Sequence, residues 1–394
     1  MNTTYTVKHI QKGLTLFIEG DFMKKLLFVL ALALSQVAMA NEIAKFDPRM
    51  AAENAVITNG VKWINAIHLP IEGKAFKNTK AYFHRLPSTL TTNVNAGVRS
   101  LQSHTTGMLL RFKTDSSKIS IKWTLSSPNL AMHHMPSTGV SGVDIYKVGA
   151  DGKYSYVKTG IPRHPRAPNQ MQVSWNSEDT CVVYLPLYNG VKEMFIGIDE
   201  KASIFAPQPH TSKVAKPVVF YGTSITHGGC ASRPGLSFVN IIGRDLDLHV
   251  INLGFSGSGK MEMEMSEHLA AIDASCYVLD CLWNMGNSMV KANYEPFIRN
   301  LRAKRPDVPI VMAGQCDVYY RPGGVFRFAA NEKLTKDLYE KLIAEGWKNL
   351  SYLPYDGQFS CNGEGTVDGC HPNDLGMMEM SKAYGNAVKK ALGL

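Results

Sequence analysis

A run of β-branched and aromatic residues at 217–222 ends abruptly in Gly222-Thr223-Ser224. A short apolar run without alternation is typical of a strand that is buried on both faces of a parallel sheet. In open α/β sheets, ligands bind at the carboxyl edge of the strands, so this strand would deliver Ser224 to a binding edge. We therefore expect Ser224 to be a nucleophile, and the rest of the chain to hold and activate it.

The residues after 216 alternate between strand-like and helix-like segments, which indicates a parallel sheet flanked by helices. Strands are predicted at 218–222, 250–254, 277–282, 310–313 and 350–353. Helices are predicted at 238–246, 263–272, 295–304, 328–345 and 374–392, and Asn373 or Asp374 can cap the last one. We assign residues 217–394 to this α/β domain.

Residues 41–208 have a different pattern and predict an all-β domain, either a sandwich or a jelly roll. The segment 118–123 alternates apolar and polar residues, as a half-buried strand does. Further strands are predicted at 108–112, 143–148, 154–158, 171–175, 181–185 and 194–198. Prolines at 207 and 209 then mark a domain edge, and we expect a linker at 209–216.

The first forty residues predict an export signal rather than a part of the fold. Lysines at 24–25 precede the apolar run 26–34, and an A-x-A cleavage site ends at Ala40. The apolar run is too short to span a bilayer. We expect translation to start at Met23, cleavage to follow Ala40, and the mature protein to be secreted or periplasmic without a membrane span.

The composition of the chain indicates a folded protein and argues against one class of partner. Apolar residues make up 45% of the 394 residues and charged residues 19%, which excludes a disordered chain. The formal net charge is +9, but the Lys and Arg residues are scattered rather than clustered, which argues against a nucleic-acid partner.

The cysteines fit an oxidising compartment, in which disulfides can form. There are seven, so at least one thiol stays outside any disulfide within the chain. Cys361 and Cys370 bracket a loop near the C-terminus that a bridge would stiffen. No spacing of cysteines and histidines resembles a zinc site, and we expect no metal.

Further candidate groups follow the other predicted strands. Gly254 ends the second strand, Asn284 follows the third, and Asp368 lies three residues before His371 in a loop ahead of the last helix. A hydroxyl needs a base to become a useful nucleophile, and the base needs an acid to orient it. Asp368 can reach one ring nitrogen of His371, which leaves the other nitrogen to face Ser224.

These residues resemble the blocks of the SGNH (GDSL-like) hydrolases, a family marked by Ser, Gly, Asn and His in that order. The blocks here are 222–225, Gly254 with 256–257, Asn284 and 368–372. The first block has threonine where the family usually has aspartate, and the third has Trp-Asn in place of Gly-x-Asn-Asp. Both departures leave the chemical groups in place and indicate a divergent branch.

A second motif is similar to that of a secreted bacterial branch of the same family, which has an N-terminal β domain. The motif Gly-x-Asp-[Leu/Ile]-Tyr is matched at 142–146. The serine block of that branch continues with Gly228 and with Ser-Arg-Pro-Gly, which is present at 232–235. The resemblance implies a three-layer, flavodoxin-like α/β domain after the β domain.

The resemblance also implies roles for the site residues. Ser224 would attack an ester carbonyl, His371 would take its proton and later give it to the leaving alcohol, and Asp368 would fix the imidazole. The backbone N–H groups of Ser224 and Gly254 and the amide of Asn284 would form the oxyanion hole. No metal or cofactor would be required.

Three more residues are candidates for substrate contacts, namely His227 and Arg233 after the nucleophile and Trp283 beside Asn284. The expected reaction is removal of a short acyl group, an acetyl ester on a carbohydrate, because β domains often accompany carbohydrate-active enzymes. Two alternatives stay open. One is a general short-chain carboxylesterase or lysophospholipase-like hydrolase, and the other is a glycan-binding protein with an idle hydrolase fold.

Overall fold

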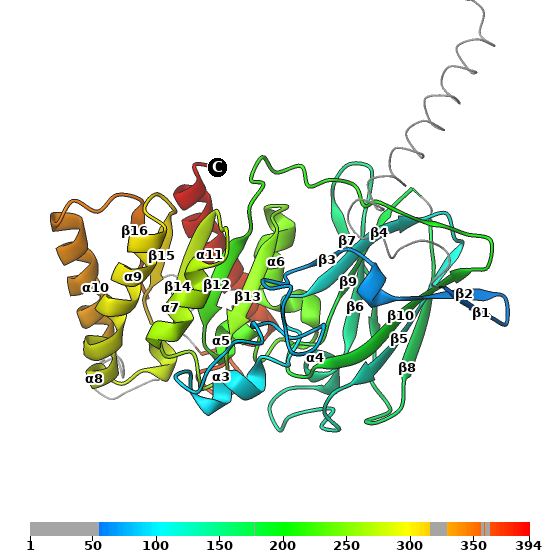
Figure 1. Ribbon diagram of the computed structural model, residues 1–394, viewed down its shortest axis with the longest axis horizontal. Helices are drawn as coiled ribbons and strands as arrows, with labels where there is room; N and C mark the ends of the chain where they lie inside the picture. The colour runs from blue at the N-terminus through cyan, green and yellow to red at the C-terminus, as the bar shows by residue number, and fades with distance from the viewer. Residues whose placement is uncertain (1–54, 177, 316–328, 356–357, 359–362) are drawn as a thin grey trace, which may run out of the picture.

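The structure is a computed structural model that describes residues 55–176, 178–315, 329–355, 358 and 363–394. An antiparallel β domain and an α/β domain lie side by side in an elongated molecule (Figure 1). The predicted export signal at 1–40 lies outside the described residues. No described helix is both long enough and apolar enough to cross a membrane.

The N-terminal domain consists of two antiparallel sheets. One sheet has the strand order β1 (Val56–Thr58), β2 (Val61–Asn65), β10 (Val191–Asp199), β5 (Lys118–Leu125) and β8 (Asn169–Ser174). The other has the order β11 (Ile204–Phe205), β4 (Leu109–Thr114), β9 (Thr180–Tyr184), β6 (Val143–Val148) and β7 (Tyr154–Gly160), and β3 (Ile71–Glu72) pairs with β4. Short helical segments between strands are η3 (Ala66–His68), α3 (Ala96–Leu101) and α4 (Ser137–Val140).

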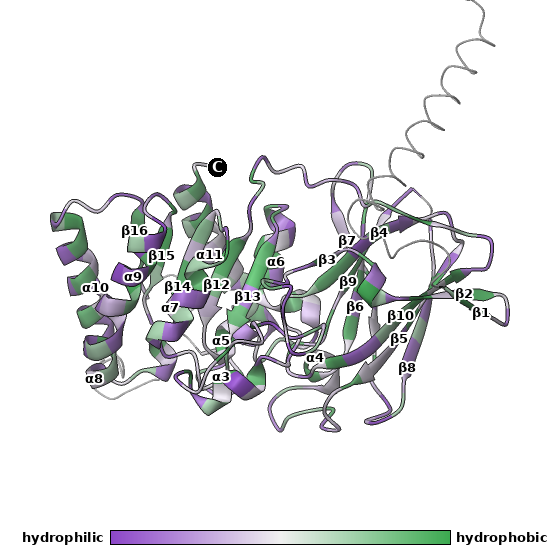
Figure 2. Ribbon diagram, viewed as in Figure 1, coloured by the Kyte–Doolittle hydropathy of each residue, from purple (hydrophilic) through white to green (hydrophobic). Residues whose placement is uncertain are grey.

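One hydrophobic core holds these two sheets together. Ile121 and Trp123 of β5 pack in the same buried cluster as Leu110 and Phe112 of β4, which belongs to the opposite sheet. Hydrophobic and hydrophilic residues both occur along the strands (Figure 2), and along β8 buried and exposed residues alternate, so that one set of side chains lies in this core and the other at the surface. The prediction of an N-terminal all-β domain is confirmed, and its two sheets are antiparallel.

The segment 75–101 departs from the all-β prediction, because it packs on the α/β domain. Leu86, Val94 and Val98 are fully buried in the core of that domain. The buried guanidinium of Arg85 donates to the carbonyls of Asn252 and Gly254, at 3.2 and 2.8 Å. These carbonyls lie on an edge strand of the α/β sheet, so the segment covers backbone groups that would otherwise have no partner.

The α/β domain contains a five-stranded parallel sheet. Its order is β13 (Val250–Gly254), β12 (Val218–Gly222), β14 (Cys276–Asp280), β15 (Ile310–Ala313) and β16 (Leu350–Leu353). The α-helices are α5 (Ser224–His227), α6 (Phe238–Asp245), α7 (Met263–Ala270), α8 (Asn287–Met289), α9 (Glu295–Lys304), α10 (Ala329–Ala344) and α11 (Asp374–Leu392). Three shorter segments are the 3₁₀ helices η4 (Pro234–Leu236) and η5 (Leu282–Asn284) and the π-helical η6 (Val290–Tyr294).

Helices cover both faces of this sheet, as expected for a three-layer domain (Figure 1). On one face, α7 and α9 contribute Leu269 and Phe297 to a buried cluster. On the other face, α6 and α11 contribute Phe238 and Tyr384 to a second cluster. The predicted parallel α/β fold is confirmed. The third strand ends at Asp280 rather than at residue 282, because the chain turns into η5.

A charged cluster links the two domains through the segment that joins them. Nδ1 of His210 lies 2.7 Å from a carboxylate oxygen of Asp247, and Nε2 lies 3.2 Å from one of Glu72. Arg111 also binds Glu72, at 3.1 Å. Burial opposes the charge on His210, but its hydrogen bonds to Asp247 and Glu72 raise its pKa to about 9. Burial likewise opposes the charge on Glu72, but His210 and Arg111 lower its pKa to about 2.

We therefore predict a stability plateau between about pH 4.5 and 6.5. The contribution of His210 is complete below its ordinary pKa of 6.5 and is lost as the pH rises through about 9. The contribution of Glu72 is complete above its ordinary pKa of 4.5 and is lost as the pH falls toward 2. The free energy of unfolding in urea should fall by about 2–3 kcal/mol from pH 6.5 to 9.

His210→Gln should flatten the alkaline side of this profile, whereas His164→Gln, at an exposed position of the β domain, should leave it unchanged. An unchanged alkaline slope in His210→Gln would contradict the assignment.

Candidate active site

Ser224 lies where β12 turns into α5. A Cβ atom at Gly222 would lie 2.1 Å from Oγ1 of Thr226 and 2.8 Å from the carbonyl of Asp280, so only glycine permits this turn. Thr223 is the N-cap of α5, and its hydroxyl accepts a hydrogen bond from the N–H of Ile225 at 3.3 Å. Threonine in place of the usual aspartate therefore keeps the capping oxygen.

Three side chains form a hydrogen-bonded chain at this edge of the sheet. Oγ of Ser224 lies 2.9 Å from Nε2 of His371, and Nδ1 of His371 lies 2.7 Å from Oδ2 of Asp368. Ser224 is 8% exposed, so the residue is buried but not completely enclosed. The loop before α11 thus brings together the serine, the imidazole and the carboxylate that the sequence nominated.

The surroundings of Asp368 stabilise its ionised form. Its Oδ1 accepts hydrogen bonds from the backbone N–H groups of Cys370 and His371, at 3.0 and 2.7 Å. Burial raises the pKa of Asp368, but these bonds and the His371 ring outweigh burial and lower it below its ordinary value. A carboxylate at Nδ1 places the ring proton there and leaves Nε2 as the acceptor for the Ser224 hydroxyl.

The loop after α5 ties Ser224 to the His371 loop. The backbone N–H of Cys230 donates to the carbonyl of Pro372 at 2.8 Å. The backbone N–H and the hydroxyl of Ser232 both donate to the carboxylate of Asp374, at 2.8 and 2.5 Å. These bonds fix the distance between two segments that are far apart in the sequence.

Asn284 has an amide that its surroundings orient. Oxygen and nitrogen of a side-chain amide are assigned from hydrogen bonding. With its oxygen toward the N–H groups of Ser258 and Gly259, the amide accepts two hydrogen bonds, at 3.0 and 3.1 Å. The amide nitrogen then lies on the opposite side, where it can act only as a donor.

Gly254 does not have the free N–H that an oxyanion donor needs. Its N–H donates to Oδ1 of Asn252 at 2.8 Å. A Cβ atom at this position would lie 2.2 Å from the backbone nitrogen of His227. The prediction that Gly254 donates to an oxyanion is therefore wrong, and this glycine instead permits close packing of β13 against α5.

Gly257, three residues later in the loop that follows β13, has the properties that Gly254 lacks. Its φ is +63°, and no described heavy atom lies within 4 Å of the position of a Cβ atom. Within the part of the chain that the structure describes, its N–H has no hydrogen-bond partner. The sequence signal for it was present, because the second block includes residues 256–257.

The Gly-x-Asp-Ile-Tyr motif joins the β domain to the serine loop. Asp144 is fully buried and accepts hydrogen bonds from the N–H of Gly235 (2.7 Å) and from Arg233 (3.0 Å). Arg233 also donates to the hydroxyl of Tyr146 at 2.7 Å and lies over the ring of Tyr156. The prediction that Arg233 contacts substrate is therefore not supported, because the motif engages its guanidinium.

His227 is also engaged away from the surface. It is fully buried, its Nε2 lies 2.9 Å from the carbonyl of Leu187, and its ring stacks on Tyr188 at 4.2 Å. Burial holds the pKa of His227 well below its ordinary value, so the ring is neutral. His227 cannot contact a substrate, and the prediction that it does is wrong.

Tyr188 and His134 bring the β domain to the site, and the sequence analysis did not single them out for it. The hydroxyl of Tyr188 donates to the backbone carbonyl of Ser224 at 2.9 Å. The ring of His134 lies 5.3 Å from that of His371. Trp283, the third candidate for a substrate contact, is half-buried against the cluster that includes α6 and α11.

Two families match adjacent parts of the chain. The GDSL-like lipase/acylhydrolase family matches residues 215–389, and the N-terminal region of SGNH-type esterases matches residues 61–204. No curated protein matches the chain.

Solved structures resemble the chain over most of its length. A protein described as a GDSL-like lipase from Bacteroides ovatus is 32% identical, with a TM-score of 0.74, over 84% of this chain and 98% of its own. The salicylyl-acyltransferase SsfX3 is 17% identical, with a TM-score of 0.68, over 86% and 99%. A family two carbohydrate esterase from Clostridium thermocellum is 13% identical, with a TM-score of 0.52, over 73% and 93%. The last two likenesses are of fold.

We predict that Gly254→Ala destabilises the protein, because its Cβ atom would meet backbone rather than a flexible side chain. The free energy of unfolding in urea should fall by about 1–3 kcal/mol. Gly286→Ala is the matched control, because no described heavy atom lies within 4 Å of the position of its Cβ atom. Equal stability of the two variants would contradict a packing role for Gly254.

Proposed function

The chain belongs to the GDSL-like lipase/acylhydrolase family, with the N-terminal region of SGNH-type esterases, and we propose that it is a serine esterase. The observation that carries this proposal is the 2.9 Å contact between Oγ of Ser224 and Nε2 of His371, backed by Asp368 at 2.7 Å. A nucleophile, a base within hydrogen-bond reach and an acid that orients the base are the parts that acyl transfer requires.

In the proposed reaction, Oγ of Ser224 attacks the ester carbonyl while its proton passes to Nε2 of His371. The imidazolium gives this proton to the leaving alcohol, and the acyl group stays on the serine. Water then loses a proton to the same nitrogen and attacks the acyl-serine, which releases the carboxylic acid and restores the hydroxyl. Asp368 remains ionised and stabilises each imidazolium.

For the oxyanion hole we propose the N–H groups of Ser224 and Gly257 and the amide nitrogen of Asn284. Gly257 replaces Gly254 in this assignment, because its N–H is without a partner among the described residues. Backbone donors held in a rigid turn cost no reorganisation as charge develops on the carbonyl oxygen.

For the substrate we propose a short acyl ester, namely an O-acetyl group on a carbohydrate. The fold likeness to a family two carbohydrate esterase supports a sugar ester. Export of the enzyme, which residues 1–40 predict, would place it where polysaccharides are found. The alternative is a general short-chain carboxylesterase or lysophospholipase-like hydrolase.

We predict that Ser224→Ala lowers kcat for p-nitrophenyl acetate by about 10⁴–10⁶, because the nucleophile is lost. Asp368→Asn should lower kcat by about 10⁴, because the His371 ring then loses its orienting carboxylate. Ser100→Ala and Asp337→Asn change exposed residues and should retain the wild-type rate. Equal background rates in the wild type and Ser224→Ala would instead favour a glycan-binding protein with an idle hydrolase fold.

The substrate is tested by acetate release from a panel of acetylated polysaccharides, together with p-nitrophenyl esters from acetate to octanoate. We expect acetate release from at least one glycan and a rate that falls as the acyl chain lengthens. A rate that rises toward octanoate, with no acetate released from any glycan, would favour the general carboxylesterase.

We predict that Asn284→Ala lowers kcat by about 10²–10³ with little change in KM, because the lost donor acts mainly in the transition state. Asn293→Ala is the matched control, since that amide donates to the carbonyl of Lys260 in the same region of the fold. A loss confined to KM would contradict the oxyanion assignment.

A further inference from the structure

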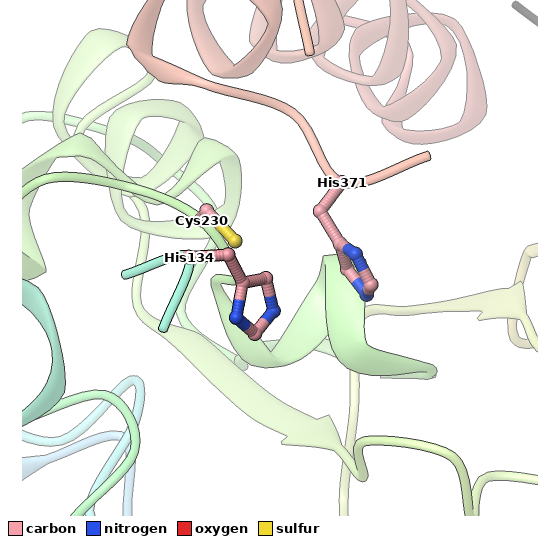
Figure 3. A group of neighbouring side chains, drawn as sticks. All are labelled: His134, Cys230 and His371. Carbon is pink, nitrogen blue, oxygen red and sulfur yellow. The ribbon is translucent and has the colours of Figure 1, made fainter. Parts of the chain in front are cut away.

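Three side chains that suit a metal ion meet beside the nucleophile. His134, Cys230 and His371 each offer one donor atom, and the three atoms lie within 4.8 Å of one another (Figure 3). The three residues are far apart in the chain, so no sequence motif predicts that they meet. His134 comes from the β domain, Cys230 from the loop after α5, and His371 from the loop before α11.

Two of the three donors are not used by the proposed esterase chemistry. Nδ1 of His134 is buried and has no hydrogen-bond partner among the described residues. Cys230 is 4% exposed, and no described cysteine forms a disulfide with it. Nδ1 is one of the two nitrogens through which His134 can bind an ion, and a cation bound there would supply the partner that a buried polar nitrogen needs.

The third donor belongs to the proposed catalytic base, and both of its ring nitrogens are engaged. Nε2 of His371 faces the hydroxyl of Ser224, and Nδ1 faces the carboxylate of Asp368. A metal bound to Nε2 would displace the serine hydroxyl, and a metal bound to Nδ1 would displace the carboxylate. In either case the imidazole can no longer take the serine proton.

The chemical types of the three donor atoms indicate which metal ion the group would bind. One thiolate and two imidazoles suit Zn²⁺, which takes three protein ligands and one water in open sites. Zn–N distances of about 2.1 Å and a Zn–S distance of about 2.3 Å separate tetrahedral ligands by about 3.4–3.7 Å. The donor atoms, which lie within 4.8 Å of one another, need to approach by about 1.4 Å at most, which side-chain rotation in three loops can supply.

We propose that His134, Cys230 and His371 form an inhibitory Zn²⁺ site that the β domain and the α/β domain complete together. On binding, the Cys230 thiol loses its proton to solvent and the sulfur coordinates the ion, with no change of oxidation state. Occupancy removes the base from the serine, so Zn²⁺ switches off the esterase reversibly. The binding step rests on the geometry of the three donors alone, and only the inhibition rests on the proposed function.

The binding step is tested without any turnover. Co²⁺ should bind the Ser224→Ala variant with one equivalent per chain and a thiolate-to-cobalt charge-transfer band, and Zn²⁺ should displace it. Cys230→Ser should abolish the band, and His134→Ala should weaken binding by at least about tenfold. His133→Ala is the matched control, because His133 is exposed and stacks on His134 at 4.3 Å but is not among the three donors.

Inhibition is tested in the active enzyme, with each variant compared with its own rate in the presence of a chelator. Zn²⁺ should inhibit the wild type and His133→Ala alike, and inhibition should require at least about tenfold more Zn²⁺ in His134→Ala and Cys230→Ser. Thermal unfolding shows whether each variant is folded, and His134→Gln serves as a second variant if His134→Ala is not.

The outcomes separate the two proposals. Absence of the charge-transfer band in Ser224→Ala, or a band that persists in Cys230→Ser, would overturn the metal site. A band that depends on Cys230, in a protein that has no esterase activity, would support the metal site. It would contradict the proposed function and, with it, the inhibitory role of the site.

Discussion

The loop that follows Ser224 holds the site together, because it binds both the β domain and the last helix. Ser232 donates twice to the carboxylate of Asp374, at the start of α11, and Cys230 donates to the carbonyl of Pro372. Gly235 donates to the buried carboxylate of Asp144 in the β domain. These bonds hold in place the two segments that make the 2.9 Å contact between Ser224 and His371.

The β domain is therefore a part of the site rather than an appendage.

Buried charge explains why the two domains cannot easily separate. Asp144 is fully buried, and without Arg233 and Gly235 its carboxylate would lie uncompensated in the interior. Tyr188 of the β domain likewise donates its hydroxyl to the backbone carbonyl of Ser224. Separation of the domains would leave polar and charged groups of both domains without their partners. Movement of one domain relative to the other would break the same contacts.

Particular residues show which features of the fold and the site could be predicted from the sequence. The apolar strands and the Gly-Thr-Ser turn were predictable, because strand burial and the steric limits of Gly222 are local properties. Arg233 and His227 were misread as substrate contacts because nearness to Ser224 in sequence says nothing about direction, and both side chains point into the domain interface. Gly254 and Gly257 could not be distinguished, since they lie three residues apart at the end of one strand and only the fold shows that Asn252 engages the first.

The sequence by itself determined the order of the elements, the parallel sheet and the identity of the serine, histidine and acid, because periodicity, turn chemistry and motif spacing are written along the chain. Only the tertiary structure decided which N–H groups are free, that segment 75–101 belongs to the α/β core, and that His134 lies beside His371. The physical reason is that hydrogen-bond satisfaction and burial depend on contacts between residues far apart in the chain, and packing of the whole molecule sets those contacts.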